Sequence, residues 1–231
     1  MTDPDPHPTT PGDPHLATPG GKPRARALGL EFGGRPGRWN AITDVPGVEV
    51  GYVTLIEGDA VRTGVTAIHP RGPAGTADPV AAGFHAQNGN GEMTGVAWIN
   101  ESGTFNGPIA ITNTHAVGVA HAGIIAWTVR HYPAVAEVWL LPVAAETWDG
   151  YLNDSTANPG AFRPGNQALS RLDFVPWGSL DPFYEAVVQA TEEAVVNALV
   201  ANEDMTGRDG HRTPALPRDR VAELLAGRRT C

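Results

Sequence analysis

Between residues 48 and 146 the chain alternates short apolar runs with glycine-rich turns. Most of these runs have the length of a strand, and several are almost continuously apolar, which is typical of strands covered on both faces. The pattern predicts strands over residues 48–56, 63–70, 79–87, 94–99, 108–114 and 137–146.

Helical spacing of apolar residues follows in three other segments. Residues 118–132 repeat apolar side chains every three or four positions, which predicts a helix. Residues 181–204 predict a longer one, in which Asp181 caps the start and Pro182 occupies the first turn. A last short helix is expected over residues 217–227. The apolar face of the long helix comprises Tyr184, Val187, Val188, Thr191, Val195, Ala198 and Leu199.

The distribution of proline sets the predicted domain boundary. Residues 1–23 hold seven prolines and almost no large apolar side chains. Such a segment buries too little surface to offset the entropy of ordering it. We therefore predict a disordered tail over residues 1–23 and a single domain over residues 24–231.

Composition and charge narrow the class of protein. Hydrophobic residues make up 41% of the chain and charged residues 18%, which is typical of a globular protein. The net charge is −9 and no Lys/Arg cluster is dense enough to follow a phosphate backbone, so we expect no nucleic-acid partner. No apolar run reaches the roughly 18 residues of a membrane span, and the N-terminus lacks the pattern of a signal peptide. These features favour a cytoplasmic protein without a membrane partner.

Nucleophiles and metal ligands give only weak signals. No serine lies in a Gly-x-Ser-x-Gly elbow. The steps Gly103–Thr104 and Gly178–Ser179 are formal self-cleavage junctions, but a plain turn is the favoured interpretation of both. His85, His115 and His121 show no spacing typical of metal ligands, so we expect neither a metal nor another cofactor.

Residues 88–95, "NGNGEMTG", form the most informative local motif. The three glycines let the backbone approach another group closely, while Asn90 and Glu92 supply polar contacts. A hairpin turn is the alternative interpretation.

Two strand ends carry further polar residues, and such groups at the mouth of a buried sheet commonly make a binding site. Glu146 could neutralise a substrate ammonium and Asn113 could donate to a carbonyl oxygen; capping of the strand ends is the alternative.

Taken together, the strings "TGVTAIHP", "NGNGEMTG", "GPIAITNTHAVGVAH", "LPVAAETWDGYLND", "STANPG" and "ATEEAVVNALVANEDMTGRDG" are similar to the DmpA-type L-aminopeptidase/D-esterase family. The resemblance covers residues 28 to about 217, in the order of the family. It implies an α+β fold, an α-β-β-α sandwich related to that of ornithine acetyltransferase. It also implies a precursor that cleaves itself before a serine, which then becomes an N-terminal nucleophile. Members hydrolyse N-terminal residues from peptides, amides and esters, need no metal and assemble as oligomers.

The sequence departs from the family pattern at two places. In the family, "YLND" continues into a long central segment with the oxyanion asparagine and the nucleophilic serine, whereas here Asp154 is followed directly by Ser155. The fold is therefore expected to be incomplete, with no catalytic residue carried over. Trp148 stands where the family usually has a tyrosine or another polar-capable residue near the nucleophile, and an indole cannot replace a phenol as acid or base.

The family residues that remain in this sequence are expected to form one wall of the substrate pocket. The expected binding residues are Asn90, Glu92, Asn113, Glu146 and Trp148. We expect an aminopeptidase-family protein that binds a small peptide or amino-acid amide and is inactive alone, because an N-terminal serine needs its base and oxyanion donors to react. Two alternatives stay open: a homo-oligomer or a non-catalytic partner of a full-length relative, and a deletion product without function.

Overall fold

The structure is a computed structural model that describes residues 12–138, 140–154 and 181–228. The chain forms two units. Unit 1 comprises Met1–Asp44, Phe174–Met205 and Thr213–Cys231, and unit 2 comprises Val45–Asp173 and Thr206–Arg212. The predicted boundary between a tail and a single domain stays a prediction.

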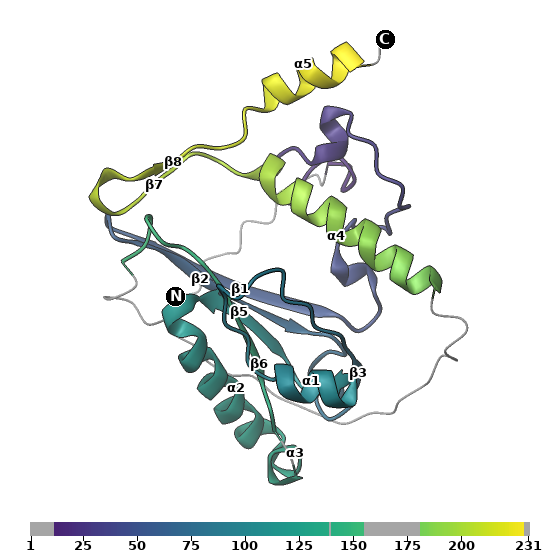
Figure 1. Ribbon diagram of the computed structural model, residues 1–231, viewed down its shortest axis with the longest axis vertical. Coiled ribbons are helices and arrows are strands. Elements are labelled where there is room, and N and C mark those ends of the chain that lie inside the picture. Colours follow the sequence, from purple (N-terminus) through teal and green to yellow (C-terminus); the bar gives the residue numbers. More distant parts are fainter. Residues whose placement is uncertain (1–11, 139, 155–180, 229–231) are drawn as a thin grey trace, which may run out of the picture. The chain divides into compact units, whose positions relative to one another are not determined.

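A four-stranded sheet forms the centre of unit 2 (Figure 1). Its strands lie in the order β1-β2-β5-β6, where β1 is Glu49–Glu57, β2 is Val61–His69, β5 is Ile109–Asn113 and β6 is Val143–Thr147. Strand β2 is antiparallel to both β1 and β5, whereas β5 and β6 are parallel. The strands predicted at residues 48–56, 63–70 and 108–114 are confirmed.

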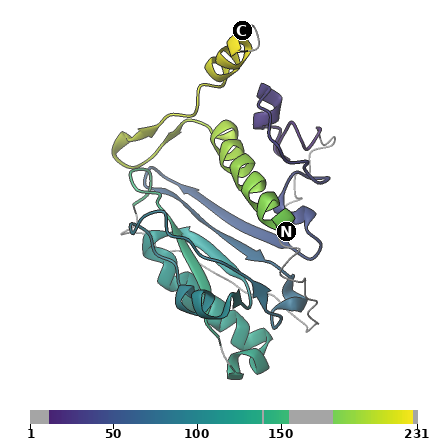
Figure 2. The same ribbon diagram turned by 45° about the vertical axis from the view of Figure 1, so that its right-hand side comes forward.

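Helix α2, Val117–His131, covers one face of this sheet and makes the crossover that a parallel β5–β6 pair requires (Figure 2). Ala110 and Ala144, which are direct neighbours across β5 and β6, pack against Ala120 and Ile124 of the helix. Small residues on the strands let the helix approach closely. The helix predicted over residues 118–132 is confirmed.

The strand predicted over residues 94–99 is wrong, because helix α1, Val96–Ser102, occupies this segment. Gly95 and Gly103, which flank the helix, both have a positive φ, and the N–H of Gly103 donates to the carbonyl of Ile99. A short apolar run with one buried face fits a helix as well as a strand. The buried side chain of Ile99 packs with Phe105 and Val143.

Two other predicted strands are much shorter in the structure. Within residues 79–87 only β3, Val80–Ala81, is a strand, and it pairs with β4, Thr104–Phe105. The strand predicted over residues 137–146 begins too early, because the short helix α3, Pro133–Val138, occupies its start. Proline fits the first turn of a helix, since its missing N–H has no helical partner there.

Unit 1 is built around helix α4, Asp181–Ala201, which confirms the long predicted helix. Its buried positions differ from the predicted apolar face. Glu193 and Val200 are buried, whereas Val187 and Val188 are 64% and 67% exposed. Helix α5, Arg218–Arg228, confirms the last predicted helix.

The short elements complete the fold. The hairpin strands β7 and β8 are Met205–Thr206 and Arg212–Thr213. Short 3-10 helices are η1 Ala25–Leu28, η2 Ile42–Asp44, η3 Pro73–Gly75, η4 Thr114–Ala116 and η6 Arg208–Gly210. In the described part of the chain, no helix is both long enough and apolar enough to cross a bilayer.

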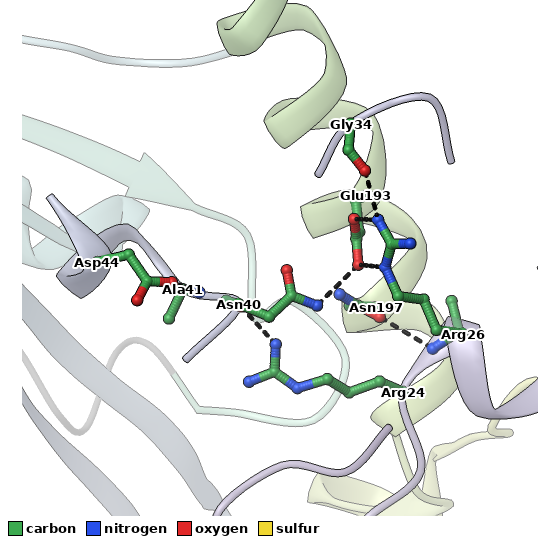
Figure 3. A network of polar contacts seen from close by, with 9 residues as sticks. Arg24, Arg26, Gly34, Asn40, Ala41, Asp44, Glu193 and Asn197 are labelled. Carbon is green, nitrogen blue, oxygen red and sulfur yellow. Dashed lines mark hydrogen bonds and ion pairs between the residues drawn. The ribbon is translucent and has the colours of Figure 1, made fainter. Parts of the chain in front are cut away.

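A polar network fastens the N-terminal segment to α4 within unit 1 (Figure 3). Arg26 donates through Nε and Nη2 to the two carboxylate oxygens of Glu193, at 2.7 and 2.6 Å. Asn40 adds a third bond to the same carboxylate at 2.8 Å, and the Asn197 side chain accepts from the backbone N–H of Ala25 at 2.9 Å. Arg26 and its partner are largely buried, so this carboxylate serves the fold.

Candidate functional site

The glycine-rich loop of residues 88–95 lies along strand β6 of unit 2. Met93 forms an antiparallel bridge with Ala145, and the N–H of Thr94 donates to the carbonyl of Ala144 at 2.9 Å. The Thr94 hydroxyl donates to the carbonyl of Pro142 at 2.7 Å and accepts from the N–H of Ala144 at 2.8 Å. These bonds give the loop one register against the strand.

That register places two glutamates opposite each other. The N–H of Glu146 donates to the carbonyl of Glu92 at 3.0 Å, one position beyond the Met93–Ala145 bridge. Residues directly opposite in such a pair have Cβ atoms about 4.5–5.5 Å apart and project to the same side. A Cβ added at Gly91 would lie 3.3 Å from one Glu146 carboxylate oxygen, so a glycine there leaves room for that carboxylate.

No basic residue neutralises this pair of carboxylates within the part of the chain that the structure describes. Glu92 is exposed and Glu146 is half-buried. Neither belongs to the ion pairs that the described residues form. Two like charges directly opposite each other repel. A cation bound between them would remove that repulsion, and a primary ammonium offers three N–H donors for carboxylate oxygens.

Asn113 lies beside these residues at the end of β5, where it is opposite Thr147 in the sheet. Its side chain is 1% exposed and is used inside the fold. The side-chain oxygen accepts from the N–H of Ala116 at 3.0 Å, and the side-chain nitrogen donates to the hydroxyl of Thr63 at 2.8 Å. The structure thus gives Asn113 the capping role that the sequence left open. Its donation to a substrate carbonyl stays a prediction.

Asn90 and Trp148 lie on the surface, each with a neighbour of its own. The N–H of Asn90 donates to the side-chain oxygen of Asn88 at 2.8 Å, which is an Asx turn within the loop. The Trp148 ring is 68% exposed and contacts the Tyr151 ring. The structure therefore sets Glu92 opposite Glu146, and the contributions of Asn90, Glu92, Glu146 and Trp148 to binding stay predictions.

Sequence reasoning missed the residue that holds the site together. Thr94 makes three of the bonds that fix the loop against β6, through its N–H and its hydroxyl. The only signal was its position at the end of "NGNGEMT", where a β-branched residue follows a flexible turn. Such a residue favours extended backbone, so the sequence could indicate a strand-like contact at this position. It could not indicate that β6 is the strand contacted.

Ser102 is the one serine within the described residues, and its hydroxyl is occupied. Its Oγ lies 2.9 Å from the carbonyl oxygen of Trp98 and 3.1 Å from that of Thr104, and it accepts from the N–H of Thr104. These contacts close the C-terminus of α1, as expected for a structural serine. The other serines, at 155, 170 and 179, lie outside the described residues, as does the Gly178–Ser179 step.

The described residues contain no group of three or more His, Cys, Asp or Glu side chains that could hold a metal ion. The carboxylate pair therefore stands without a third ligand of this kind in the described ranges.

Comparison with known proteins places these features in a family. The family model "Peptidase family S58" matches residues 40–171 and 155–213. Beta-peptidyl aminopeptidase BapA from Sphingosinicella microcystinivorans is 52% identical over a match of 141 residues that covers 57% of this chain and 35% of that relative. BapA from Sphingosinicella xenopeptidilytica is 51% identical over the same length. The match thus spans about a third of the length of these relatives.

Solved structures agree with this assignment. L-aminopeptidase D-ala-esterase/amidase from Ochrobactrum anthropi, described as a variant of the Ntn hydrolase fold, matches with a TM-score of 0.72 and 27% identity over 90% of this chain and 99% of that chain. A β-aminopeptidase from Burkholderia sp. matches with a TM-score of 0.72 and 26% identity over 88% of this chain and 98% of its own. These likenesses confirm the predicted α+β fold of the DmpA type. The chain belongs to peptidase family S58, the family of the DmpA-type aminopeptidases.

Proposed function

We propose that the carboxylate pair Glu92–Glu146 binds the free amino group of a small peptide or amino-acid amide. The observation that carries this proposal is the register of the loop on β6, which sets Glu92 opposite Glu146 with no basic partner among the described residues. An ammonium between two carboxylates forms charge-assisted hydrogen bonds, which are roughly twice as strong as neutral ones. The aminopeptidase relatives make such a ligand chemically consistent with the family.

We further propose that the chain alone does not hydrolyse what it binds. The peptide bond between Asp154 and Ser155 occupies the place where the family resemblance expects the nucleophile segment. The family model matches in two parts that overlap over residues 155–171, which supports a shortened central region. The described serine, Ser102, has a hydroxyl engaged at the end of α1. Hydrolysis by an N-terminal serine needs a free hydroxyl, a base and oxyanion donors together.

Two assays on the purified chain separate binding from hydrolysis. Titration with L-leucine amide is expected to show saturable binding, and N-acetyl-L-leucine amide, which has no ammonium, is expected to bind at least about tenfold more weakly. Release of p-nitroaniline from L-leucine p-nitroanilide is expected to stay at the background rate, with a β-aminopeptidase of the family as the positive control. Equal binding of the two amides contradicts the amino-group site, and release that a serine-reactive inhibitor abolishes contradicts the lack of hydrolysis.

A second candidate function is that of a non-catalytic partner of a full-length relative. Strand β1 is an edge of the sheet, and Tyr52, Val53 and Ile56 on it are 76%, 55% and 60% exposed. A long exposed apolar edge strand is a template for pairing with another chain. Co-expression with a full-length relative is expected to yield a complex that Val53→Lys weakens. A chain that elutes alone in the presence of the relative contradicts this role.

A further inference from the structure

Three aromatic rings form a row on the surface of unit 2, next to the end of β6. Trp148 and Tyr151 are 68% and 60% exposed. Their rings meet edge to face, with centroids 5.1 Å apart and planes at 75°. The ring of His211, 60 positions further along the chain, continues the row, 5.3 Å from that of Tyr151 and tilted by 35°. We call these three side chains the aromatic row.

The backbone under the aromatic row is held by one hydrogen bond between two distant segments and one within the second segment. The N–H of Arg208 donates to the carbonyl of Leu152 at 3.2 Å, and the N–H of Gly207 donates to the carbonyl of His211 at 2.9 Å. A Cβ at Gly207 would lie 2.2 Å from the Leu152 carbonyl oxygen, so the two segments can approach this closely only because residue 207 is glycine. The segment with His211 is thus fixed beside the segment with Tyr151.

Trp148 is exposed but held in place by its neighbours. A Cβ added at Gly150 would lie only 2.1 Å from the indole Cζ2, so the indole packs directly on the glycine backbone. The ring of Tyr151 contacts the indole edge to face and holds it from another side. A large apolar ring that is both exposed and fixed loses little entropy when a ligand covers it, which is the condition under which aromatic groups bind well.

The turn beneath the rings also contains polar atoms without partners. The side-chain nitrogen of Asn153, a residue only 1% exposed, has no hydrogen-bond partner among the described residues, and neither does Oδ2 of Asp149. The carbonyl of Asp149 already accepts from the N–H groups of Leu152 and Asn153, so the backbone of the turn is satisfied. Buried polar side-chain atoms are normally hydrogen-bonded, so these two atoms keep unused hydrogen-bonding capacity within the described residues.

We propose that the aromatic row is a subsite for an aromatic side chain of the bound peptide or amino-acid amide. This inference rests on the proposed function, in which the carboxylate of Glu146 holds the amino group. Trp148 follows two positions after Glu146, a separation of about 6.6 Å along extended backbone, which is within the reach of one amino-acid residue. Flat rings at mutual angles offer an aromatic ligand both stacked and edge-to-face contacts, which are favourable beyond the area they bury.

The test compares phenylalanine amide, glycine amide and N-acetyl-phenylalanine amide by calorimetric titration of the full chain. Phenylalanine amide is expected to bind about tenfold more tightly than glycine amide. Trp148→Ala and Tyr151→Ala are expected to reduce this ratio about fivefold, whereas Trp148→Phe and Tyr151→Phe, which keep a ring, retain most of it. Trp39→Ala in unit 1, where Trp39 is 45% exposed, is the matched control and is expected to leave the ratio unchanged.

The outcomes separate the aromatic row from the amino-group site. Equal affinities for phenylalanine amide and glycine amide, a ratio that survives Trp148→Ala, or no binding of phenylalanine amide at about 10 mM overturns the inference. If phenylalanine amide and its N-acetyl form bind equally and both depend on Trp148, the aromatic row stands and the amino-group site falls. If amides bind through their ammonium without aromatic preference, the amino-group site stands and the aromatic row falls.

Discussion

Carboxylates in the two units stand in opposite electrostatic surroundings. In unit 1, Glu193 is 7% exposed and receives three hydrogen bonds from Arg26 and Asn40 (Figure 3). In unit 2, Glu92 and Glu146 lie opposite each other and form no ion pair within the described residues. A carboxylate that the chain itself neutralises serves the fold, whereas an opposed pair of glutamates with no ion-pair partner in the described ranges is suited to a ligand.

The largest effect is expected where the carboxylate serves the fold. Arg26→Ala leaves Glu193 largely buried without its cation, and breaking a buried pair in this way is expected to lower the free energy of unfolding by about 3 kcal/mol. Chemical denaturation measures this difference. Arg220→Ala is the control, because Arg220 and Glu223 form an ion pair whose side chains are both 65% exposed, and such pairs contribute only about 0.5 kcal/mol. Equal losses in the two variants contradict the assigned role of Glu193.

The next effect separates binding from stability. Glu146→Gln is expected to weaken the binding of L-leucine amide about tenfold, because one charged partner of the ammonium is lost. The same change removes a like-charge repulsion and is expected to raise the free energy of unfolding by about 0.5 kcal/mol. Calorimetric titration and denaturation measure the two quantities. Glu101→Gln, at an exposed position of α1, is expected to change neither. A Glu146→Gln variant that binds normally removes this residue from the site.

A smaller effect is expected at the residue that aligns the two carboxylates. Thr94→Val keeps the shape of the side chain but loses the bonds of the hydroxyl to the carbonyl of Pro142 and the N–H of Ala144, so the free energy of unfolding is expected to fall by about 1 kcal/mol. A loosened loop no longer fixes Glu92 opposite Glu146, and the affinity for L-leucine amide is expected to fall as well. If stability falls but affinity does not, the register of the loop is not what makes the site.

The response to acid distinguishes the structural carboxylate from a buried histidine. Hydrogen bonds from Arg26 lower the pKa of Glu193, so its contribution to stability is present above the ordinary pKa of 4.5 and is lost as the pH falls through the lower folded value. Burial, and then the charge of Arg130, lower the pKa of His131, which packs on Trp127. The unfolded chain therefore takes up a proton there first, and stability falls as the pH drops below 6.5.

The free energy of unfolding, measured across this pH range, tests the roles assigned to His131 and Glu193. His131→Phe is expected to flatten the stability profile between about pH 6.5 and pH 5, and Arg26→Ala is expected to flatten it only below about pH 4.5. His69 also contributes in the upper range, because burial lowers its pKa against the opposing charge of Glu49. An unchanged upper range in His131→Phe contradicts the neutral, buried state of that histidine.

The sequence predicted most of the sheet of unit 2, because its strands are long apolar runs bounded by turns. The same rule failed at residues 94–99, where the run is short and its helix is set by Gly95 and Gly103 on either side. The buried face of α4 was also not predictable. A charged residue, Glu193, is buried there because Arg26 and Asn40 approach it from a distant segment, and such partners leave no periodic signal along the helix.

The candidate site could be predicted in its residues but not in its geometry. Polar residues at the ends of two apolar runs indicated Glu146 and Asn113, and the glycine-rich motif indicated Glu92. Asn113 caps η4 through a local bond to Ala116, three positions further along the chain. That Glu92 lies opposite Glu146 depends on the pairing of the loop with β6, which adjacent residues in the sequence do not encode. The aromatic row joins Tyr151 to His211, so it too arises only from the tertiary contact of two segments.

A double-mutant cycle on Glu92 and Glu146 tests the central claim most directly. The free energies of unfolding of the wild type, Glu92→Gln, Glu146→Gln and the double variant give the coupling between the two carboxylates. Without a ligand this coupling is expected to be repulsive by about 0.5 kcal/mol, and with saturating L-leucine amide it is expected to become favourable. A coupling near zero that the amide leaves unchanged would contradict an ammonium site between these two residues.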